Sequence, residues 1–173
     1  LNRDLEFNAH LDSIKAFGEE ACARLISKML GYSYVDPKST FAVSQEYSNA
    51  RILDKSERKI NKFRNTRTPF VHPGFYGYTS RGNIATFSRN GSDLTGSYLA
   101  ASLDALLYEN FTDVDGLYPA DPNIVKDTKI LTEVTFYEIR YLAYMGFKIH
   151  PESIVSIAER MIPMHIRNTF KYP

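Results

Sequence analysis

The sequence lacks several features that would place it in a specialised class of protein. It contains one cysteine, Cys22, and no tryptophan. A single cysteine excludes a disulfide within the chain, which fits the reducing cytoplasm. No apolar run approaches the ~20 residues that cross a membrane, and the first residues do not read as a secretory signal, which has a basic stretch followed by an apolar one. We therefore expect a cytoplasmic protein that does not bind membranes.

An excess of charge of either sign is also missing. The chain has 21 basic and 20 acidic residues and a net charge of +1, which gives no reason to expect nucleic-acid binding. Its histidines show no metal-ligand spacing with Cys22, and we expect no metal held directly by side chains. The 173 residues, 43% hydrophobic, suit one globular domain with a buried core. Because the first residue is Leu1 rather than Met, we expect the chain to belong to a longer protein.

Helical and strand-like patterns alternate along the chain. Apolar spacing predicts a helix over residues 11–30 that stops at Gly31, although Gly18 leaves open a later start near residue 18. The other expected elements are strands at 32–35, 84–87, 106–111 and 164–167, helices at 53–63 and 151–160, and an aromatic strand and turn at 69–77 with a tight turn at 81–83. This alternation predicts an α/β sheet with helices on both faces and ligands at the strand ends.

Two more helices carry recognisable start signals. Ser92 and Asp93 are residue types that cap helix N-termini, and an apolar helical stripe follows them. Thr135 and Glu138 have the spacing of a capping box, which opens a helix that we expect to end at Gly146.

Residues 88–96, with the sequence SRNGSDLTG, are a candidate anion site. Gly91 allows the backbone to approach a ligand, and the helix start that follows offers free N–H groups and a positive dipole end. Arg89 adds a fixed cation that suits a carboxylate or a phosphate. An ordinary turn followed by an N-cap explains the same residues, and on this segment alone it is the simpler interpretation.

An acidic loop follows the strand expected at 106–111. Asp113, Asp115 and Asp121 lie there with one glycine and two prolines. Such a loop could hold a ribose, a Mg²⁺-phosphate or a Ca²⁺ ion, although the later ligand positions of an EF-hand are missing. A solvated acidic turn remains an equally good interpretation of the local pattern.

Two single residues are weaker candidates. Glu19 follows Gly18 and could meet a substrate amine, but a glutamate on a helix is usually a surface residue. Lys148 lies between Gly146 and His150 and could neutralise a phosphate, although a solvated lysine is the default interpretation.

Taken together and in chain order, these segments resemble the aspartate kinases of the amino-acid kinase family. The matching stretches are FGE at 17–19, SNAR at 48–51, PGFYG at 73–77, FSRNGSD at 87–93, TDVDGLY at 112–118, MGFK at 145–148 with HP at 150–151, and RNTF at 167–170. They extend over nearly the whole chain. Each stretch alone is a weak signal, and it is their order that makes the resemblance specific.

The resemblance implies a fold and a division of the chain. The fold would be an incomplete three-layer α/β/α sandwich with a mainly parallel sheet, as in carbamate kinase-like proteins. Residues 1–87 would form part of the aspartate-binding half, and residues 88–173 mainly the ATP-binding half. The parent protein would be a homo-oligomer whose small-molecule partners are L-aspartate and ATP.

The resemblance also implies roles for individual residues. Glu19 would meet the substrate amine, Arg89 would bind the α-carboxylate, and Asp93 would orient a lysine of the family's Lys-Phe-Gly-Gly segment. The aspartate would be surrounded by Phe75, Arg89, Asn90 and Ser92, and Arg89 and Asp93 would be the catalytic residues. ATP would be held by Thr112, Asp113, Tyr118, Lys148 and the Ile149 backbone, with Mg²⁺ held through the phosphates. The β-carboxylate would then attack the γ-phosphate in line.

The chain departs from the family pattern at several points. It contains no Lys-Phe-Gly-Gly segment, so we expect these 173 residues alone to be inactive, and it contains no tail of small regulatory (ACT) domains. Asn90 stands where the family has glycine, Asn123 stands where Asp-Pro-Arg is usual, and the run 148–150 is one residue short. Two alternatives therefore stay open: another amino-acid kinase that acts on glutamate, uridylate or carbamate, or a non-catalytic nucleotide-binding domain.

Overall fold

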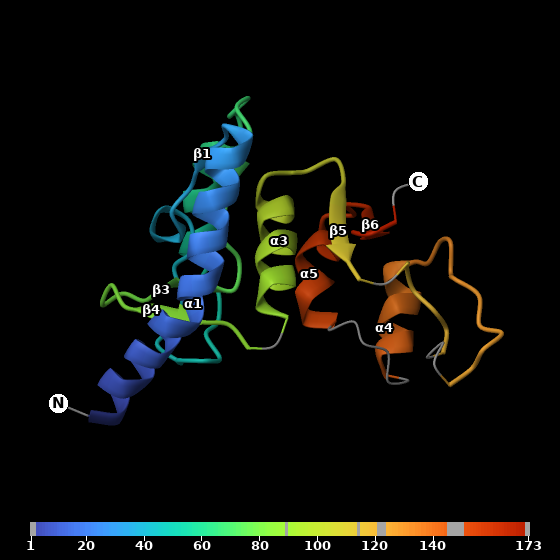
Figure 1. Ribbon diagram of the computed structural model, residues 1–173, viewed down its shortest axis with the longest axis horizontal. Coiled ribbons are helices and arrows are strands. Elements are labelled where there is room, and N and C mark those ends of the chain that lie inside the picture. Colours follow the sequence, from blue (N-terminus) through green and yellow to red (C-terminus); the bar gives the residue numbers. More distant parts are fainter. Residues whose placement is uncertain (1–2, 89, 114, 121–123, 145–150, 172–173) are drawn as a thin grey trace.

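The structure is a computed structural model that describes residues 3–88, 90–113, 115–120, 124–144 and 151–171 (Figure 1). The described elements in chain order, where η denotes a 3₁₀ helix, are α1 (Arg3–Leu30), β1 (Ser33–Tyr34), η1 (Pro37–Ser39), α2 (Lys55–Ile60), η2 (Asn61–Phe63), β2 (Phe70–Val71), β3 (Tyr76–Tyr78), β4 (Ile84–Thr86), α3 (Gly91–Ser102), β5 (Tyr108–Thr112), α4 (Phe136–Tyr144), α5 (Pro151–Glu159) and β6 (Met164–Asn168). No helix in this part of the chain has the length and apolar character needed to span a bilayer.

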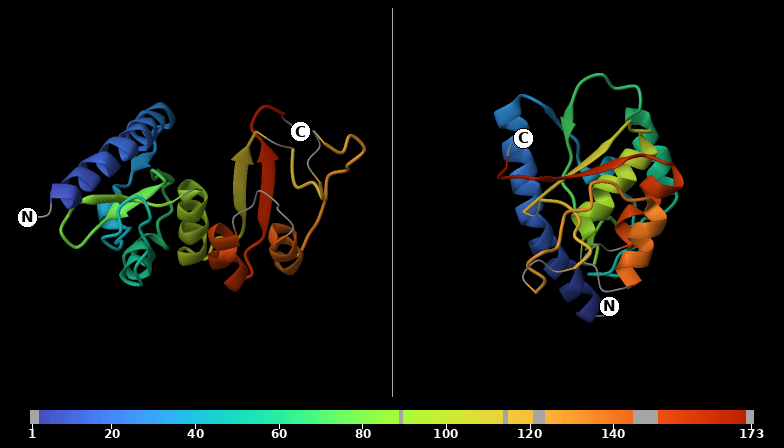
Figure 2. Two further views of the ribbon diagram at one scale, coloured as in Figure 1. Left: turned by 90° about the horizontal axis from the view of Figure 1, so that it is seen from below. Right: turned by 90° about the vertical axis from the view of Figure 1, so that its right-hand side faces the viewer.

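The strands of the described residues pair in three short sheets. β1 and β2 are parallel, β3 and β4 form an antiparallel hairpin, and β5 and β6 are parallel. The hairpin turns at Gly82, which has φ +82°, a left-handed value that glycine adopts without strain. This confirms the tight turn expected at 81–83. In Figure 2, β5 and β6 run side by side in the same direction, so both of their carboxyl ends lie at one edge.

The long helix α1 covers the hairpin and the first parallel pair. Its buried residues Asp12, Ala16, Ala23 and Ser27 repeat at helical spacing along one face. Gly18 lies on the exposed face, with nothing within 4 Å of where a Cβ would be. The later helix start near Gly18 is therefore wrong, because burial of the opposite face carries the helix through this residue.

Two hydrophobic clusters meet at helix α3. The first contains Phe41, Val43, Ala50, Ile60, Ala85 and Phe87, and the second contains Ala100, Ala101, Leu117, Ile139, Ile154, Ile157 and Ile162. Leu94 and Tyr98 of α3 pack on the first cluster, whereas Ala100 and Ala101 belong to the second. Figure 1 accordingly shows α3 between α1 with its strands and α5. The division of the chain at residue 88 into substrate halves stays a prediction.

The start of α3 differs from the expectation. The N-cap is Asn90, in a left-handed conformation with φ 60° and without a side-chain capping bond. Ser92 and Asp93 therefore lie inside the first turn and are not caps. Asparagine adopts the left-handed conformation more readily than most residues, so the helix begins directly after Asn90 and both side chains are available for other contacts.

Other boundaries moved by a few residues. β5 begins at Tyr108 rather than at residue 106, since Leu106 is 93% exposed and has no strand partner. The charged helix expected at 53–63 is the shorter α2 followed by η2. The capping box is confirmed, because the backbone N–H of Thr135 donates to Glu138 Oε2 at 2.7 Å and that of Glu138 donates to Thr135 Oγ1 at 3.2 Å. The expected end of this helix at Gly146 lies outside the described residues.

Candidate functional site

The turn at residues 73–77 packs directly onto the first turn of α3. A Cβ on Gly91 would lie 2.8 Å from both Phe75 Cδ2 and Phe87 Cβ, and one on Gly74 would lie 3.1 Å from Ser92 Cβ. Glycine at position 91 is required for this approach, and at position 74 a larger residue would need Ser92 to shift by a few tenths of an ångström. The Phe75 N–H donates to Thr95 Oγ1 at 3.0 Å and so fixes the turn to the helix. The structure thus brings the predicted substrate residues Phe75 and Ser92 together.

A carboxylate from α1 reaches the same place. Ser92 Oγ donates to Glu19 Oε1 at 3.5 Å, a contact that spans 73 positions in the sequence. Phe75 and Asn90 both have positive φ values, 77° and 60°, which are rare for residues other than glycine and cluster at functional sites. Glu19, Phe75, Asn90 and Ser92 therefore surround the N-terminus of α3, whereas Arg89 lies outside the described residues.

Asp93 points to the neighbouring strand β5. Asn110 Nδ2 donates to Asp93 Oδ1 at 2.9 Å, and the same amide lies 3.3 Å from the Tyr108 hydroxyl. The sequence analysis missed Asn110. The available signal was the alternation of β5, in which Tyr108, Asn110 and Thr112 are half-buried and the residues between them are exposed.

The acidic loop is fixed to the end of β6. The Thr169 N–H donates to the Thr112 carbonyl at 2.8 Å, and Asn168 Nδ2 donates to Asp115 Oδ1 at 2.7 Å. Lys171 Nζ lies 2.6 Å from the other oxygen of Asp115. Hydrogen bonds from Lys171 and then Asn168 lower the pKa of the Asp115 carboxyl below its usual value, so it stays ionised near neutral pH.

The predicted nucleotide residues are only partly described. Thr112 Oγ1 donates to Asp113 Oδ1 at 3.2 Å, and Tyr118 follows in the same loop as a half-buried side chain. The structure thus places Thr112 and Asp113 at the carboxyl end of a parallel strand, which is the usual ligand edge in α/β proteins. Lys148 and Ile149 lie outside the described residues, as do Asp121 and Asn123.

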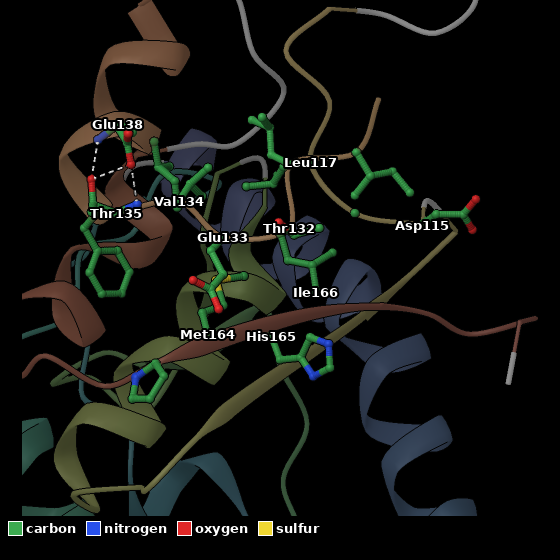
Figure 3. A pocket seen from close by; sticks show the side chains of 16 residues that line it. Asp115, Leu117, Thr132, Glu133, Val134, Thr135, Glu138, Met164, His165 and Ile166 are labelled. Carbon is green, nitrogen blue, oxygen red and sulfur yellow. Dashed lines mark hydrogen bonds between the residues drawn. The ribbon is translucent and has the colours of Figure 1, made fainter. Parts of the chain in front are cut away.

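A pocket of about 690 Å³ opens beside this loop (Figure 3). Its lining comes from residues 115–117, 130–136, 138–139 and 163–166. Figure 3 shows Glu138 engaged with Thr135 at one end, through the capping-box hydrogen bonds. Thr112, Asp113 and Tyr118 are not among the lining residues, so the pocket adjoins the predicted nucleotide loop without containing its predicted contacts.

A buried carboxylate supports the substrate side of the site from behind. Asp12 on α1 is 0% exposed, and its Oδ2 accepts the Ser48 N–H at 2.7 Å and the Thr86 N–H at 2.8 Å. Ser48 Oγ donates to Oδ1 at 2.8 Å, and Lys15 Nζ lies 3.4 Å away. Burial alone would raise the pKa of Asp12, but the hydrogen bonds from Thr86 and Ser48 outweigh it and lower the pKa. Asp12 thus ties α1, which carries Glu19, to strand β4, which leads into the α3 turn.

Comparison with known proteins identifies the family. The profile of the amino acid kinase family matches residues 2–168, and the chain belongs to this family. Its relatives are aspartate kinases: it is 41% identical over 167 residues to aspartokinase 3 of Bacillus subtilis, covering 92% of this chain and 37% of that protein. The chain thus spans little more than a third of the length of this relative.

Solved structures confirm the fold. The aspartate kinase of Clostridium acetobutylicum superimposes with a TM-score of 0.81 at 36% identity, over 92% of this chain and 37% of that one. Escherichia coli aspartokinase III in complex with aspartate and ADP superimposes with a TM-score of 0.82 at 24% identity, over 93% of this chain and 38% of that one. The α/β fold of the amino-acid kinases, expected from the sequence, is therefore confirmed.

Proposed function

We propose that the protein to which this chain belongs transfers the γ-phosphoryl group of ATP to the β-carboxylate of L-aspartate, giving 4-phospho-L-aspartate. This would be the first step towards lysine, threonine and methionine, carried out by a cytoplasmic homo-oligomer with no role for nucleic acid or membranes. The observation that carries the proposal is the contact between Glu19 and Ser92 at the start of α3, beside Phe75. A carboxylate and a helix N-terminus side by side suit a substrate with both an amine and carboxylates.

The amino group and the carboxylates of the amino acid would each be bound by groups of opposite charge. Glu19 attracts the substrate amine, while the N–H groups of the first turn of α3 and the guanidinium of Arg89 attract its carboxylates. Phe75 closes one side of this subsite, and Asn90 and Ser92 supply polar contacts. The E. coli aspartokinase III structure with aspartate and ADP is a precedent for such a substrate pair within the fold.

The nucleotide would lie at the carboxyl end of β5. Thr112, Asp113 and Tyr118 would contact it together with Lys148 and the Ile149 backbone. Among the residues that the structure describes, no group of three or more His, Cys, Asp or Glu is arranged to hold a metal ion, and the Asp115 carboxylate is engaged by Asn168 and Lys171. Mg²⁺ would arrive with ATP and be held through its phosphates, where it would neutralise their charge.

The reaction would need positioning and charge stabilisation rather than a general base. A carboxylate is already ionised at neutral pH, so one of its oxygens can attack the γ-phosphorus directly. The new bond joins that oxygen to phosphorus, the bond from the γ-phosphorus to the β–γ bridging oxygen breaks, and ADP leaves with the electron pair. Asp93 would orient a lysine ammonium towards the transferring group, which lowers the barrier by charge complementarity.

A trapping assay on the full-length protein tests the proposal. Hydroxylamine converts an acyl phosphate into a hydroxamate, so we expect ATP-dependent hydroxamate with L-aspartate and none with L-glutamate. With uridylate or carbamate we expect no ATP turnover. The 173-residue chain alone should give no product. Hydroxamate from glutamate, or turnover with uridylate or carbamate, would assign a different kinase. If calorimetry shows MgATP binding but no acceptor is phosphorylated, the non-catalytic alternative is correct.

Matched variants test the site itself. Glu19→Gln should raise the KM for aspartate roughly tenfold or more, because a charge-assisted contact to the amine is lost, and should leave the KM for ATP unchanged. Glu20→Gln is the control, since Glu20 pairs with Arg24 on the same helix at 2.7 Å. Equal effects of the two variants would remove Glu19 from the substrate subsite.

A further inference from the structure

Strand β5 carries a row of polar side chains that faces helix α3. Tyr108, Asn110 and Thr112 are half-buried, whereas Glu109 and Phe111 between them are exposed, as the two-residue period of a strand requires. Thr112 at the end of this row is a predicted nucleotide contact. Asn110, two positions earlier, contacts Asp93 of α3. The row therefore connects the nucleotide edge of the sheet with the carboxylate at the helix start.

We propose that Asn110 is a positioning residue that fixes the Asp93 carboxylate for phosphoryl transfer and couples it to the nucleotide strand. This inference rests on the proposed function, in which Asp93 orients a lysine. Asn110 is not one of the proposed substrate contacts and would act through Asp93.

The ionised carboxylate determines the direction of the hydrogen bond between Asn110 and Asp93. An ionised carboxylate only accepts hydrogen bonds, so the Asn110 amide must turn its Nδ2 group, the donor, towards Asp93 Oδ1 at 2.9 Å. Nδ2 carries a second hydrogen, and the Tyr108 hydroxyl lies 3.3 Å from it as an acceptor. Burial raises the pKa of the Tyr108 phenol, which therefore stays neutral. The amide is thus held from two sides in one orientation.

The packing of α3 on β5 depends on a small residue one turn after Asp93. A Cβ on Gly96 would lie 2.6 Å from the Tyr108 hydroxyl and 3.0 Å from Tyr108 Cε2. Glycine at this position lets the tyrosine ring sit under the helix, which brings Asn110 within reach of Asp93. The close approach at Gly96 therefore serves the polar contacts of β5 as well as the packing of the helix on the strand.

Holding one carboxylate oxygen restricts rotation of the whole group. With Oδ1 bound to Asn110, Oδ2 of Asp93 points in one direction only, which is what orientation of a neighbouring ammonium requires. Without Asn110, the carboxylate would sample other rotamers, and the fraction of molecules with the productive geometry would fall. The loss should appear in kcat, because Asn110 is not among the residues proposed to contact aspartate or ATP.

The test replaces Asn110 in the full-length protein. Asn110→Leu, which has a similar volume and no donor, should lower kcat roughly tenfold to a hundredfold while both KM values stay within about twofold. Tyr108→Phe keeps the contact to Asp93 and should have a much smaller effect. Asn110→Ser, whose hydroxyl is too short to reach Asp93, should reproduce the loss if leucine disturbs the strand. Thermal unfolding of each variant checks that the fold is intact.

A double-mutant cycle separates positioning from packing. In an Asp93→Asn background the Asn110→Leu change should have little further effect on kcat, because its target is already gone. Unchanged kcat in Asn110→Leu, or a loss that persists undiminished in the Asp93→Asn background, would overturn the role of Asn110. If the unaltered protein phosphorylates no acceptor at all, the proposed function fails instead, so the two failures are distinguishable.

Discussion

Each half of the chain contains a carboxylate that joins distant segments of that half, and the two carboxylates lie in contrasting environments. In the first half, Asp12 is fully buried and accepts hydrogen bonds from Ser48 and Thr86, which lie 36 and 74 positions away in the sequence. In the second half, Asp115 is 28% exposed and binds Asn168 and Lys171 near the end of the chain. Both carboxylates organise a candidate substrate region, but only one of them does so out of reach of water.

The two carboxylates should differ in how strongly they hold the segments that they bind. Hydrogen bonds to a buried charge are costly to break, because the donors left behind are desolvated. Ion pairs in contact with water are weak and screened by salt. The region around Asp12 should therefore be a rigid scaffold, and the acidic loop at residues 112–118 should depend on contacts that are individually weak. Each of the following predictions tests one part of this difference.

The largest effect is expected at Asp12. Asp12→Ala removes the acceptor for the buried Thr86 N–H and for the Ser48 N–H and hydroxyl, and we expect a loss of about 4 kcal/mol in the free energy of unfolding. Urea denaturation measures it. Asp54→Ala is the matched control, because Asp54 precedes α2 without a side-chain capping bond and is exposed. Similar losses for the two variants would contradict the importance of the buried anchor.

The next largest effect is a pH dependence that comes from the first half. The Pro73 carbonyl, which only accepts, lies 2.6 Å from His72 Nδ1, so this nitrogen carries the proton, and Nε2 accepts from Thr40 Oγ1 at 2.7 Å. Burial lowers the pKa of His72 from 6.5 to about 4. The unfolded chain thus takes up a proton below pH 6.5, but the folded protein does so only below about pH 4.

Acid therefore destabilises the folded protein through His72. The contribution of His72 to stability is complete above pH 6.5, falls by about 1.4 kcal/mol per pH unit down to about pH 4, and then levels off after a total of about 3 kcal/mol. Urea denaturation at several pH values gives the free energy of unfolding of the unaltered protein and of His72→Gln. The difference between these two free energies is then followed as a function of pH. His10→Gln, at an exposed histidine, is the control for the loss of an imidazole. If the difference in free energy of unfolding stays constant between pH 6.5 and 4, the imidazole of His72 is accessible to protons in the folded protein.

Local patterns predicted the fold well because their partners are close in sequence. The capping box of Thr135 and Glu138 spans three residues, and the hairpin at Gly82 needs only a turn type, so both were confirmed. The start of α3 was assigned wrongly at Ser92 because the usual cap residues were present. The true N-cap, Asn90, depends on its left-handed backbone conformation, which the residue type alone does not reveal.

The site was less predictable, since its contacts are non-local. Family order placed Glu19 and Ser92 in one subsite before any geometry was known, and the structure brings them within 3.5 Å. Asp12 and Asn110 were missed because each lies on a regular element and gains its meaning from a partner 17 to 74 positions away. No spacing rule along a single helix or strand reports such a partner.

Two glycines allow a direct comparison of packing in the two halves. A Cβ on Gly77 in β3 would lie 2.5 Å from Val43 Cγ1 and 3.0 Å from the Phe41 carbonyl oxygen, so Gly77→Ala should cost about 2 kcal/mol. A Cβ on Gly96 would lie 2.6 Å from the Tyr108 hydroxyl, at the end of a side chain that would have to shift, and the gain of about 1 kcal/mol in helix propensity for alanine offsets this cost. Gly96→Ala should therefore change the unfolding free energy by less than about 1 kcal/mol. Thermal unfolding that ranks the two variants in the opposite order would reverse the comparison.

The smallest effect is expected where the two halves are linked at the surface. Arg160 Nη2, just after α5, lies 2.6 Å from Glu57 Oε1 of α2, and the two side chains are 47% and 42% exposed. A double-mutant cycle with Glu57→Ala and Arg160→Ala should give a coupling of about 0.5 kcal/mol, reduced further by 1 M salt. Arg160 also lies 3.5 Å from Asp104, so the cycle is needed to isolate this one pair. A salt-insensitive coupling above about 2 kcal/mol would mean that exposed charges clamp the two halves as firmly as Asp12 holds the first, and the contrast between them would disappear.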